Sequence, residues 1–254
     1  MSDIVRTDTF YTMANSVEGI TDADYQRVKP CVETVKSLAQ TTYQSIYIID
    51  FFRHNFLYVS DNPTLLCGQT ADTMRQMGYD FFHTYVPEEE QPMLDNMNVA
   101  GFKAFYDVPV EHRRECMLSF DFHLRHGDHL MLVNHKSTPM ALTPNGSIWL
   151  VLAMVSISPH KEAGHIEFFR FYSRERLEYM LDTDNWIHRD TVTLSPEERQ
   201  VLMLSAQGYT MKEIAVLICR SFDTVKFYRR QLFKKLNAQS VTEALTFATN
   251  YGLI

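Results

Sequence analysis

Four helix-start signals crowd into residues 194–251 and constrain the fold there more than any other feature of the chain. Three of them have the pattern Ser/Thr-x-x-Glu, in which a hydroxyl and a carboxylate cap each other's backbone N–H groups. They are Ser195 with Glu198, Thr210 with Glu213, and Ser240 with Glu243, and Ser221 is placed to cap a further helix. Pro196 also suits the first turn of a helix. The spacing predicts a compact all-helical domain.

The helix expected at 221–236 has two unlike faces. Apolar residues recur at helical spacing on one face, namely Val225, Tyr228, Leu232 and Leu236. The other face carries Asp223, Lys226, Phe227, Arg230 and Lys234. Five cations and one acid give residues 221–236 a net charge of +4. We expect the apolar face to pack against neighbouring helices and the cationic face to point outward.

This cationic ridge has two interpretations. A charged helix face is usually only the solvated side of an amphipathic helix. Here two helices precede it, and Gly208 stands where the first of them should stop. That arrangement is a helix-turn-helix, whose last helix suits the major groove of DNA, and we favour this interpretation.

The same residues resemble a known family. The matching positions are Leu194-Ser195-Pro196-Glu197-Glu198, Val201-Leu202, Gly208, Glu213-Ile214-Ala215, Ser221, Thr224-Val225 and Lys235-Leu236. Residues 190–254 are similar to the four-helix DNA-binding domain of LuxR-type (GerE-like) transcriptional regulators. The resemblance implies double-stranded DNA as partner, with base edges reached by Lys226, Phe227 and Arg230. It implies phosphate contacts from Lys212, Ser221, Thr224, Tyr228, Arg229 and Lys234.

Three positions depart from the family pattern. Tyr228 stands where histidine is usual, Phe227 is bulkier than usual, and Arg220 occupies an ordinarily apolar place in the turn. Phe227 suggests an apolar contact such as a thymine methyl group. The departures also support an alternative function, a protein-interaction module that keeps the helix-turn-helix fold but no longer binds DNA.

We expect DNA binding by a homodimer, because one small recognition helix buries too little surface to be selective. The fourth helix, Ser240 to Tyr251, offers Val241, Leu245 and Ala248 for the contact between subunits.

Residues 22–158 predict an α+β domain. A helix opens at Thr21-Asp22, two strands follow within Ile46 to Ser60, and several short helical segments then lead to about Phe105. Three antiparallel strands come next, at Cys116–Arg125, His129–Pro139 and Ile148–Ser156. This order, with the segment from Asp80 to Glu90, resembles a PAS sensor domain, an antiparallel sheet with helices on one face. The resemblance implies sensing or dimerisation, with a small cavity that could hold an unidentified small-molecule ligand.

Two segments lie outside these domains. Residues 1–21 are expected to form a tail, and 159–189 a linker. Within the linker, the alternation in Ile166 to Leu181 favours a hairpin, with a helix as the alternative, and Asp182 to Arg189 is expected to be an exposed connector.

The charge of the chain is divided unequally. Of the net −7, residues 1–189 carry −9 and residues 190–254 carry +2, which suits a regulator that touches DNA through one small module. The four cysteines are scattered without a CxxC pair, so we expect reduced thiols and a cytoplasmic protein. No signal pattern or membrane-length apolar run is visible, and no membrane association is expected.

No catalytic constellation is present, so we expect neither an enzyme nor a cofactor. Four histidines on one expected hairpin, His123, His126, His129 and His135, raise the question of a metal site. They lack a completing ligand at suitable spacing, so we predict no metal. A phosphoacceptor domain centred on Asp50 is a further alternative, although the alternating β/α order it requires is missing. The acidic run Glu88–Glu90 is expected to be a solvated helix start.

Overall fold

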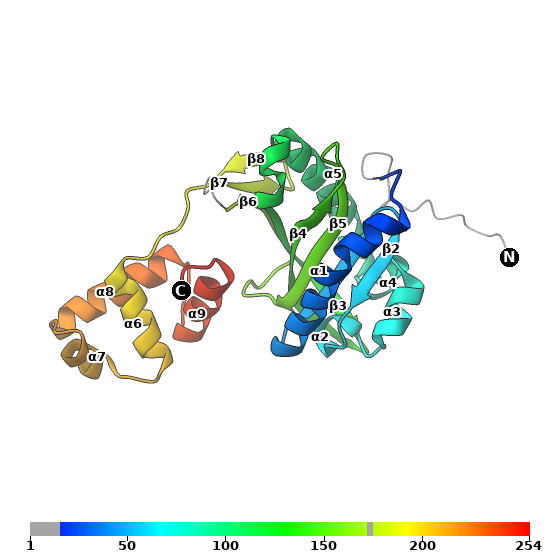
Figure 1. Cartoon of the computed structure of the whole chain (residues 1–254). Coiled ribbons are helices and arrows are strands. Elements are labelled where there is room, and N and C mark those ends of the chain that lie inside the picture. The colour runs from blue at the N-terminus through cyan, green and yellow to red at the C-terminus, as the bar shows by residue number, and fades with distance from the viewer. Residues whose placement is uncertain (1–15, 172–174) are drawn as a thin grey trace. The chain divides into compact units, whose positions relative to one another are not determined.

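The computed structural model describes residues 16–171 and 175–254. The chain divides into two compact units, residues 1–189 and 190–254 (Figure 1). Within the described residues, none of the helices is long and apolar enough to cross a membrane. The four cysteines are free, Cys31 and Cys219 on the surface and Cys67 and Cys116 in the interior.

The first unit alternates strands and short helices in the predicted order. Its elements are α1 (Asp22–Thr41), β1 (Ser45–Asp50), β2 (Asn55–Val59), α2 (Pro63–Leu66), α3 (Ala71–Met77), α4 (Asp80–Tyr85), η1 (Glu88–Glu90), α5 (Gln91–Asp107), η2 (Val110–Glu115), β3 (Cys116–His126), β4 (His129–Leu142), β5 (Ile148–Ile157), β6 (Gly164–Arg170), β7 (Glu175–Met180) and β8 (Asn185–His188).

All of these strands join one antiparallel sheet in the order β2-β1-β5-β4-β3-β6-β7-β8. The helices α2 to α5 are inserted between β2 and β3, as the resemblance to a PAS domain predicts. Because alternate residues of a strand face opposite sides, Phe120 and Phe122 point into the core while Asp121 points to the other face. The rings of Phe120 and Phe122 contact the buried ring of His135 on β4.

The segment expected as a linker is instead part of the sheet. Its β6–β7 hairpin follows the predicted alternation, although residues 172–174 of the turn lie outside the described residues. The expected connector also contains a strand, β8, in which Trp186 pairs with Tyr179 and packs on its ring at 5.1 Å. The indole is too large an apolar surface to leave in solvent, so this segment folds back onto β7.

The prediction of a tail at residues 1–21 is also partly wrong. Residues 1–15 lie outside the described residues, but Val17 is buried in the core of the first unit. Thr21 then caps α1 through a reciprocal box with Asp24. Figure 1 shows α1 passing in front of the sheet. The apolar side chains of Val32 and Val35 on α1 are buried, whereas that of Leu38 near its C-terminal end is exposed.

Asp50 holds the end of β1 in place. Its carboxylate accepts hydrogen bonds from the Tyr25 hydroxyl of α1 and from the backbone N–H groups of Phe52 and Arg53. The Tyr25 ring also packs edge-on against Trp149 at 5.2 Å. An interior carboxylate with three donors in an antiparallel sheet is a structural group, so the phosphoacceptor alternative is wrong.

The second unit consists of α6 (Pro196–Ala206), α7 (Met211–Leu217), α8 (Phe222–Lys235) and α9 (Val241–Asn250). Each begins at the predicted residue, and the capping boxes at Ser195 and Thr210 are complete. The third box differs, because the Glu243 carboxylate accepts from the backbone of Gln239 while Ser240 caps alone. The predicted four-helix domain is confirmed.

Candidate functional site

The helix α8 is seated by its apolar face, as predicted. Val225 packs with Val201 of α6 and Ile214 of α7 in one buried cluster. Leu232 and Leu236 pack in a second cluster with residues of α6 and α9. Ser221 begins the helix by accepting a hydrogen bond of 3.1 Å from the backbone of Thr224. Two clusters and a capped end fix the rotation of α8 about its axis.

That rotation leaves the opposite face in solvent. We call this face the cationic ridge; it consists of Asp223, Lys226, Phe227, Arg230 and Lys234, all of which are exposed. The Phe227 side chain is 48% exposed, and the Arg230 guanidinium lies over its ring, 5.9 Å from the centroid. The three residues expected to reach base edges therefore share one accessible surface.

The residues expected to contact phosphates have more varied surroundings. Lys212 is exposed near the start of α7, and Arg229 stacks over Phe233 at 5.1 Å. The hydroxyls of Ser221 and Thr224 lie 2.8 Å apart at the N-terminus of α8. Tyr228 is half-buried and packs against the cluster of Val201 and Val225, so its ring has a structural role as well.

Lys235 differs from the other cations of α8. Its ammonium lies 2.7 Å from the buried Glu198 carboxylate and donates to the backbone oxygen of Thr193. The same carboxylate accepts from the backbone of Ser195 in the capping box. Lys235 thus ties the end of α8 to the start of α6. Sequence reasoning missed this pair, because its members are 37 residues apart.

The unusual turn before α8 is regular in the structure. Cys219 adopts a left-handed conformation with φ 51°. The backbone N–H of Cys219 donates to Val216 and that of Arg220 to Ala215, which is the Schellman arrangement that closes helix ends. The Arg220 side chain is exposed, so its charge does not disturb the turn.

The prediction that α9 provides the contact between subunits is partly wrong. Ala248 is completely buried within its own domain. Val241 and Leu245 are half-buried against the same cluster, which contains Leu202 and Phe247. The apolar stripe of α9 therefore packs on α6, because a four-helix domain of this size needs that stripe for its own core.

The first unit contains a partly open cavity of about 80 Å³. Its lining is mostly apolar and aromatic, with a few polar groups; it includes Phe51, Phe102, Phe105, Leu118, Phe168, Asn98, His135 and Ser137. His135 also lines a smaller neighbouring cavity. Its Nε2 pairs with the Tyr47 hydroxyl, whereas its buried Nδ1 has no hydrogen-bond partner. Burial lowers the pKa of His135 to about 3, so the ring is neutral.

The histidines of the β3–β4 hairpin do not converge on one point. The backbone N–H of His123 donates to one oxygen of the Glu90 carboxylate, and the Nδ1 of His123 pairs with the other oxygen. Glu90 therefore links η1 to β3 and is not part of a solvated helix start. His135 is interior, and His129 is exposed at the tip. Within residues 16–171 and 175–254, the side chains that do meet in metal-binding geometry are Asp121, His160 and His165. Sequence reasoning missed this group, because Asp121 is far from the two histidines in the chain and no motif links them.

The second unit is similar to known proteins. The family described as "Bacterial regulatory proteins, luxR family" matches residues 192–248. The regulatory protein SdiA of Escherichia coli is 34% identical over 71 residues, 26% of this chain and 30% of that relative. The quorum-sensing-dependent regulator RpaR of Rhodopseudomonas palustris is 35% identical over 91 residues, 36% of each chain. The chain thus spans about a third of the length of these relatives.

The whole chain also has a distant structural likeness. A phage VqmA–DPO complex has 16% sequence identity and a TM-score of 0.31, covering 90% of this chain and 91% of that chain. A likeness this weak carries no functional assignment.

Proposed function

We propose that this protein, whose residues 192–248 belong to the luxR family of bacterial regulatory proteins, is a transcriptional regulator that binds specific DNA sequences through α8. The observation that supports this function is the cationic ridge: Lys226, Phe227 and Arg230 are exposed together while Val225 and Leu232 on the opposite face are buried. A helix held in this way enters the major groove and presents its outer side chains to base edges.

The side chains of the ridge divide by their chemistry. Arg230 has a planar fork of donors that pairs with two acceptors of a guanine, and the Phe227 ring beside it suits a thymine methyl group. Lys226 adds a flexible donor next to them. We assign the contacts with phosphate oxygens to other polar residues of α7, of α8 and of the N-cap of α8, namely Lys212, Ser221, Thr224, Tyr228, Arg229 and Lys234.

Selected DNA sites and mobility shifts test this division. Arg230→Ala should cost about 1–3 kcal/mol at the selected site and relax the base preference at one position. Lys234→Ala should weaken binding to all sequences alike, because a phosphate contact carries no sequence information. The matched control for Arg230→Ala is Arg199→Ala, which removes an exposed arginine from α6. Unchanged selectivity in Arg230→Ala would count against base reading by α8.

Salt dependence separates DNA binding from the alternative of a protein-interaction module. A binder that neutralises several phosphates loses affinity steeply as the salt concentration rises. The logarithm of the binding constant falls with the logarithm of the salt concentration, with a slope of about −0.9 for each phosphate neutralised. We expect Lys234→Ala to reduce that slope by about one. Affinity that does not respond to salt, or no affinity for any duplex, would favour the protein-interaction module.

We propose that a homodimer is the DNA-binding form, because a single helix in one groove buries too little surface for selectivity. The prediction is a selected site with two related half-sites about one helical turn apart. Sedimentation of the protein with a full site and with a half-site measures the stoichiometry. One chain per full site would contradict the proposal.

We further propose that the first unit senses a small, largely apolar molecule in the cavity beside His135. The buried Nδ1 of the neutral imidazole supports this, because an unpaired interior polar atom is costly and a ligand can satisfy it. Mass spectrometry of protein extracted under native conditions would reveal a bound molecule. Ser137→Phe, which should fill the cavity, is expected to abolish that signal, and retention of the molecule in this variant would exclude the cavity as its site.

A further inference from the structure

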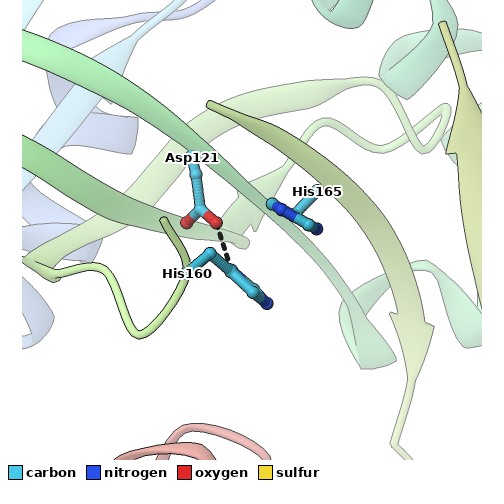
Figure 2. A group of neighbouring side chains, drawn as sticks. All are labelled: Asp121, His160 and His165. Atoms are coloured by element: carbon cyan, nitrogen blue, oxygen red, sulfur yellow. Dashed lines mark hydrogen bonds and ion pairs between the residues drawn. The ribbon is translucent and has the colours of Figure 1, made fainter. Parts of the chain in front are cut away.

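We propose that Asp121, His160 and His165 form a binding site for one divalent transition-metal ion, with Zn²⁺ as the expected occupant (Figure 2). One donor atom of each side chain lies within 4.8 Å of the other two. A carboxylate and two imidazoles are a common zinc donor set, with further positions filled by water. Mg²⁺ and Ca²⁺ prefer oxygen ligands throughout, so the two imidazoles favour a first-row transition metal.

The carboxylate of this site is held rigidly. Asp121 is fully buried on β3, and its Oδ1 accepts a hydrogen bond of 2.7 Å from the Asn134 side chain on β4. The same amide donates to the Ser119 hydroxyl, which fixes its orientation. The other oxygen, Oδ2, faces Nδ1 of His160 (Figure 2). A ligand oriented by a second hydrogen-bonded group is typical of metal sites.

An irregularity in the sheet brings His165 to this carboxylate. The pairing of β3 with β6 shifts by a bulge between Ser119 and Asp121, at the point where Asp121 lies opposite Gly164. The following residue, His165, has a left-handed backbone with φ 49°, a conformation that few residues other than glycine adopt. Bulges of this kind redirect side chains and are frequent beside functional sites.

The two imidazoles are stacked, with ring centroids 3.8 Å apart and planes at 13°. Two protonated rings at this spacing would repel each other. Neutral imidazoles are the form that binds metals. Metal–nitrogen bonds of about 2.0–2.1 Å require the donors to move closer, and the exposed His165 has room to rotate.

The surrounding charges favour a cation. Three carboxylates, those of Asp121, Glu162 and Glu178, act electrostatically on His165. Lys136 opposes them in part, because it lies within reach of Asp121 and Glu167. A bound ion would join β3 to the start of β6. The strands β6 to β8 extend the sheet up to the end of the first unit at residue 189.

Zinc binding by the full-length chain without a histidine tag tests the site. Protein freed of metal with EDTA is titrated with Zn²⁺ by calorimetry at pH 7.5, and plasma emission measures the zinc retained after gel filtration. We expect one equivalent in the wild type. His160→Gln and His165→Asn should each lower the affinity at least about tenfold, as changes around metal sites do. Asparagine is chosen for position 165 because it tolerates a left-handed backbone.

The matched control is His129→Gln at the exposed tip of the β3–β4 hairpin, which should bind zinc like the wild type. Zinc should also raise the melting temperature of the wild type and of this control, but not of His165→Asn. Failure to retain one equivalent would overturn the proposal. So would equal affinity in His165→Asn and His129→Gln, because the zinc would then be held elsewhere, for example by the exposed thiols of Cys31 and Cys219.

Discussion

The two units of this protein place their charged and polar groups in opposite ways. In the helical unit, Lys226, Arg230 and Lys234 extend into solvent from a helix whose apolar face is buried. In the sheet unit, Asp50, Asp121 and His135 are in the interior, each hydrogen-bonded to a neighbouring element. The cations on the surface of the helical unit are available to a partner, whereas these interior polar groups of the sheet unit are hydrogen-bonded within the fold.

This difference predicts what a substitution does. An exposed cation contributes little to stability, because solvent already surrounds it, so its loss should affect binding alone. A buried polar group leaves its partners unsatisfied when it is removed, so its loss should affect stability first. Lys235 is the exception within α8, since it pairs with a buried carboxylate.

The largest expected effect is that of Asp50→Ala. The change leaves the Tyr25 hydroxyl and two backbone N–H groups without their acceptor, which should cost about 2–4 kcal/mol. Urea unfolding followed by circular dichroism measures the shift in the transition of the first unit. The matched control, Asp61→Ala at an exposed site, should change stability by less than about 0.5 kcal/mol. Equal effects of the two changes would show that the interior carboxylate is no more important for stability than an exposed one.

The next effect is a dependence on pH that comes from His135. In the unfolded chain its imidazole takes up a proton below about pH 6.5. In the folded unit burial lowers the pKa to about 3, so the ring stays neutral. The unfolded state therefore binds more protons between these values. The contribution is complete above about pH 6.5 and falls by about 1.4 kcal/mol for each pH unit below it.

Unfolding of the wild type and of His135→Leu between pH 5 and 7.5 measures this contribution. The variant should show a flatter dependence of stability on pH, because it lacks the group that titrates. His129→Gln, at an exposed position, should keep the slope of the wild type. If the stability of His135→Leu depends on pH as steeply as that of the wild type, other groups are responsible for the dependence.

A smaller effect is expected from a pair of adjacent lysines on α8. Lys235→Met leaves the Glu198 carboxylate buried without its cation and should destabilise the helical unit by about 1–2 kcal/mol, after allowance for the partial exposure of the lysine. Lys234→Met, at the next residue, should stay within about 0.5 kcal/mol in stability but weaken DNA binding. Thermal unfolding and mobility shifts on both variants would show whether Lys235 contributes to stability while Lys234 contributes to DNA binding.

The smallest effect on stability is expected for Phe227→Ala, within about 0.5 kcal/mol, because the side chain is already 48% exposed. Affinity for the selected DNA should nevertheless fall by about 1–2 kcal/mol, the scale of burying part of an aromatic side chain. Phe222→Ala, another exposed phenylalanine of α8, is the matched control and should leave the base preference unchanged. Loss of stability without loss of affinity would identify Phe227 as a structural residue.

The sequence alone determined the helical unit and most of the order of the sheet unit. Each cap of α6 to α9 joins residues three or four positions apart, as in Ser195 with Glu198, so the pattern is readable along the chain. The rotation of α8 followed in the same way from the spacing of Val225, Leu232 and Leu236. Strand alternation at Phe120 and Phe122 likewise predicted which face of β3 is buried.

Only the tertiary structure decided which distant residues meet. It paired Lys235 with Glu198 and brought His160 and His165 to Asp121. It also joined the expected hairpin to β3 and added β8 in the segment expected to be an exposed connector. These contacts join residues far apart in the chain, and they depend on strand register and on a bulge that no local pattern announces. Caps and amphipathic faces are encoded within a few residues, whereas a site assembled across strands exists only after the sheet has formed.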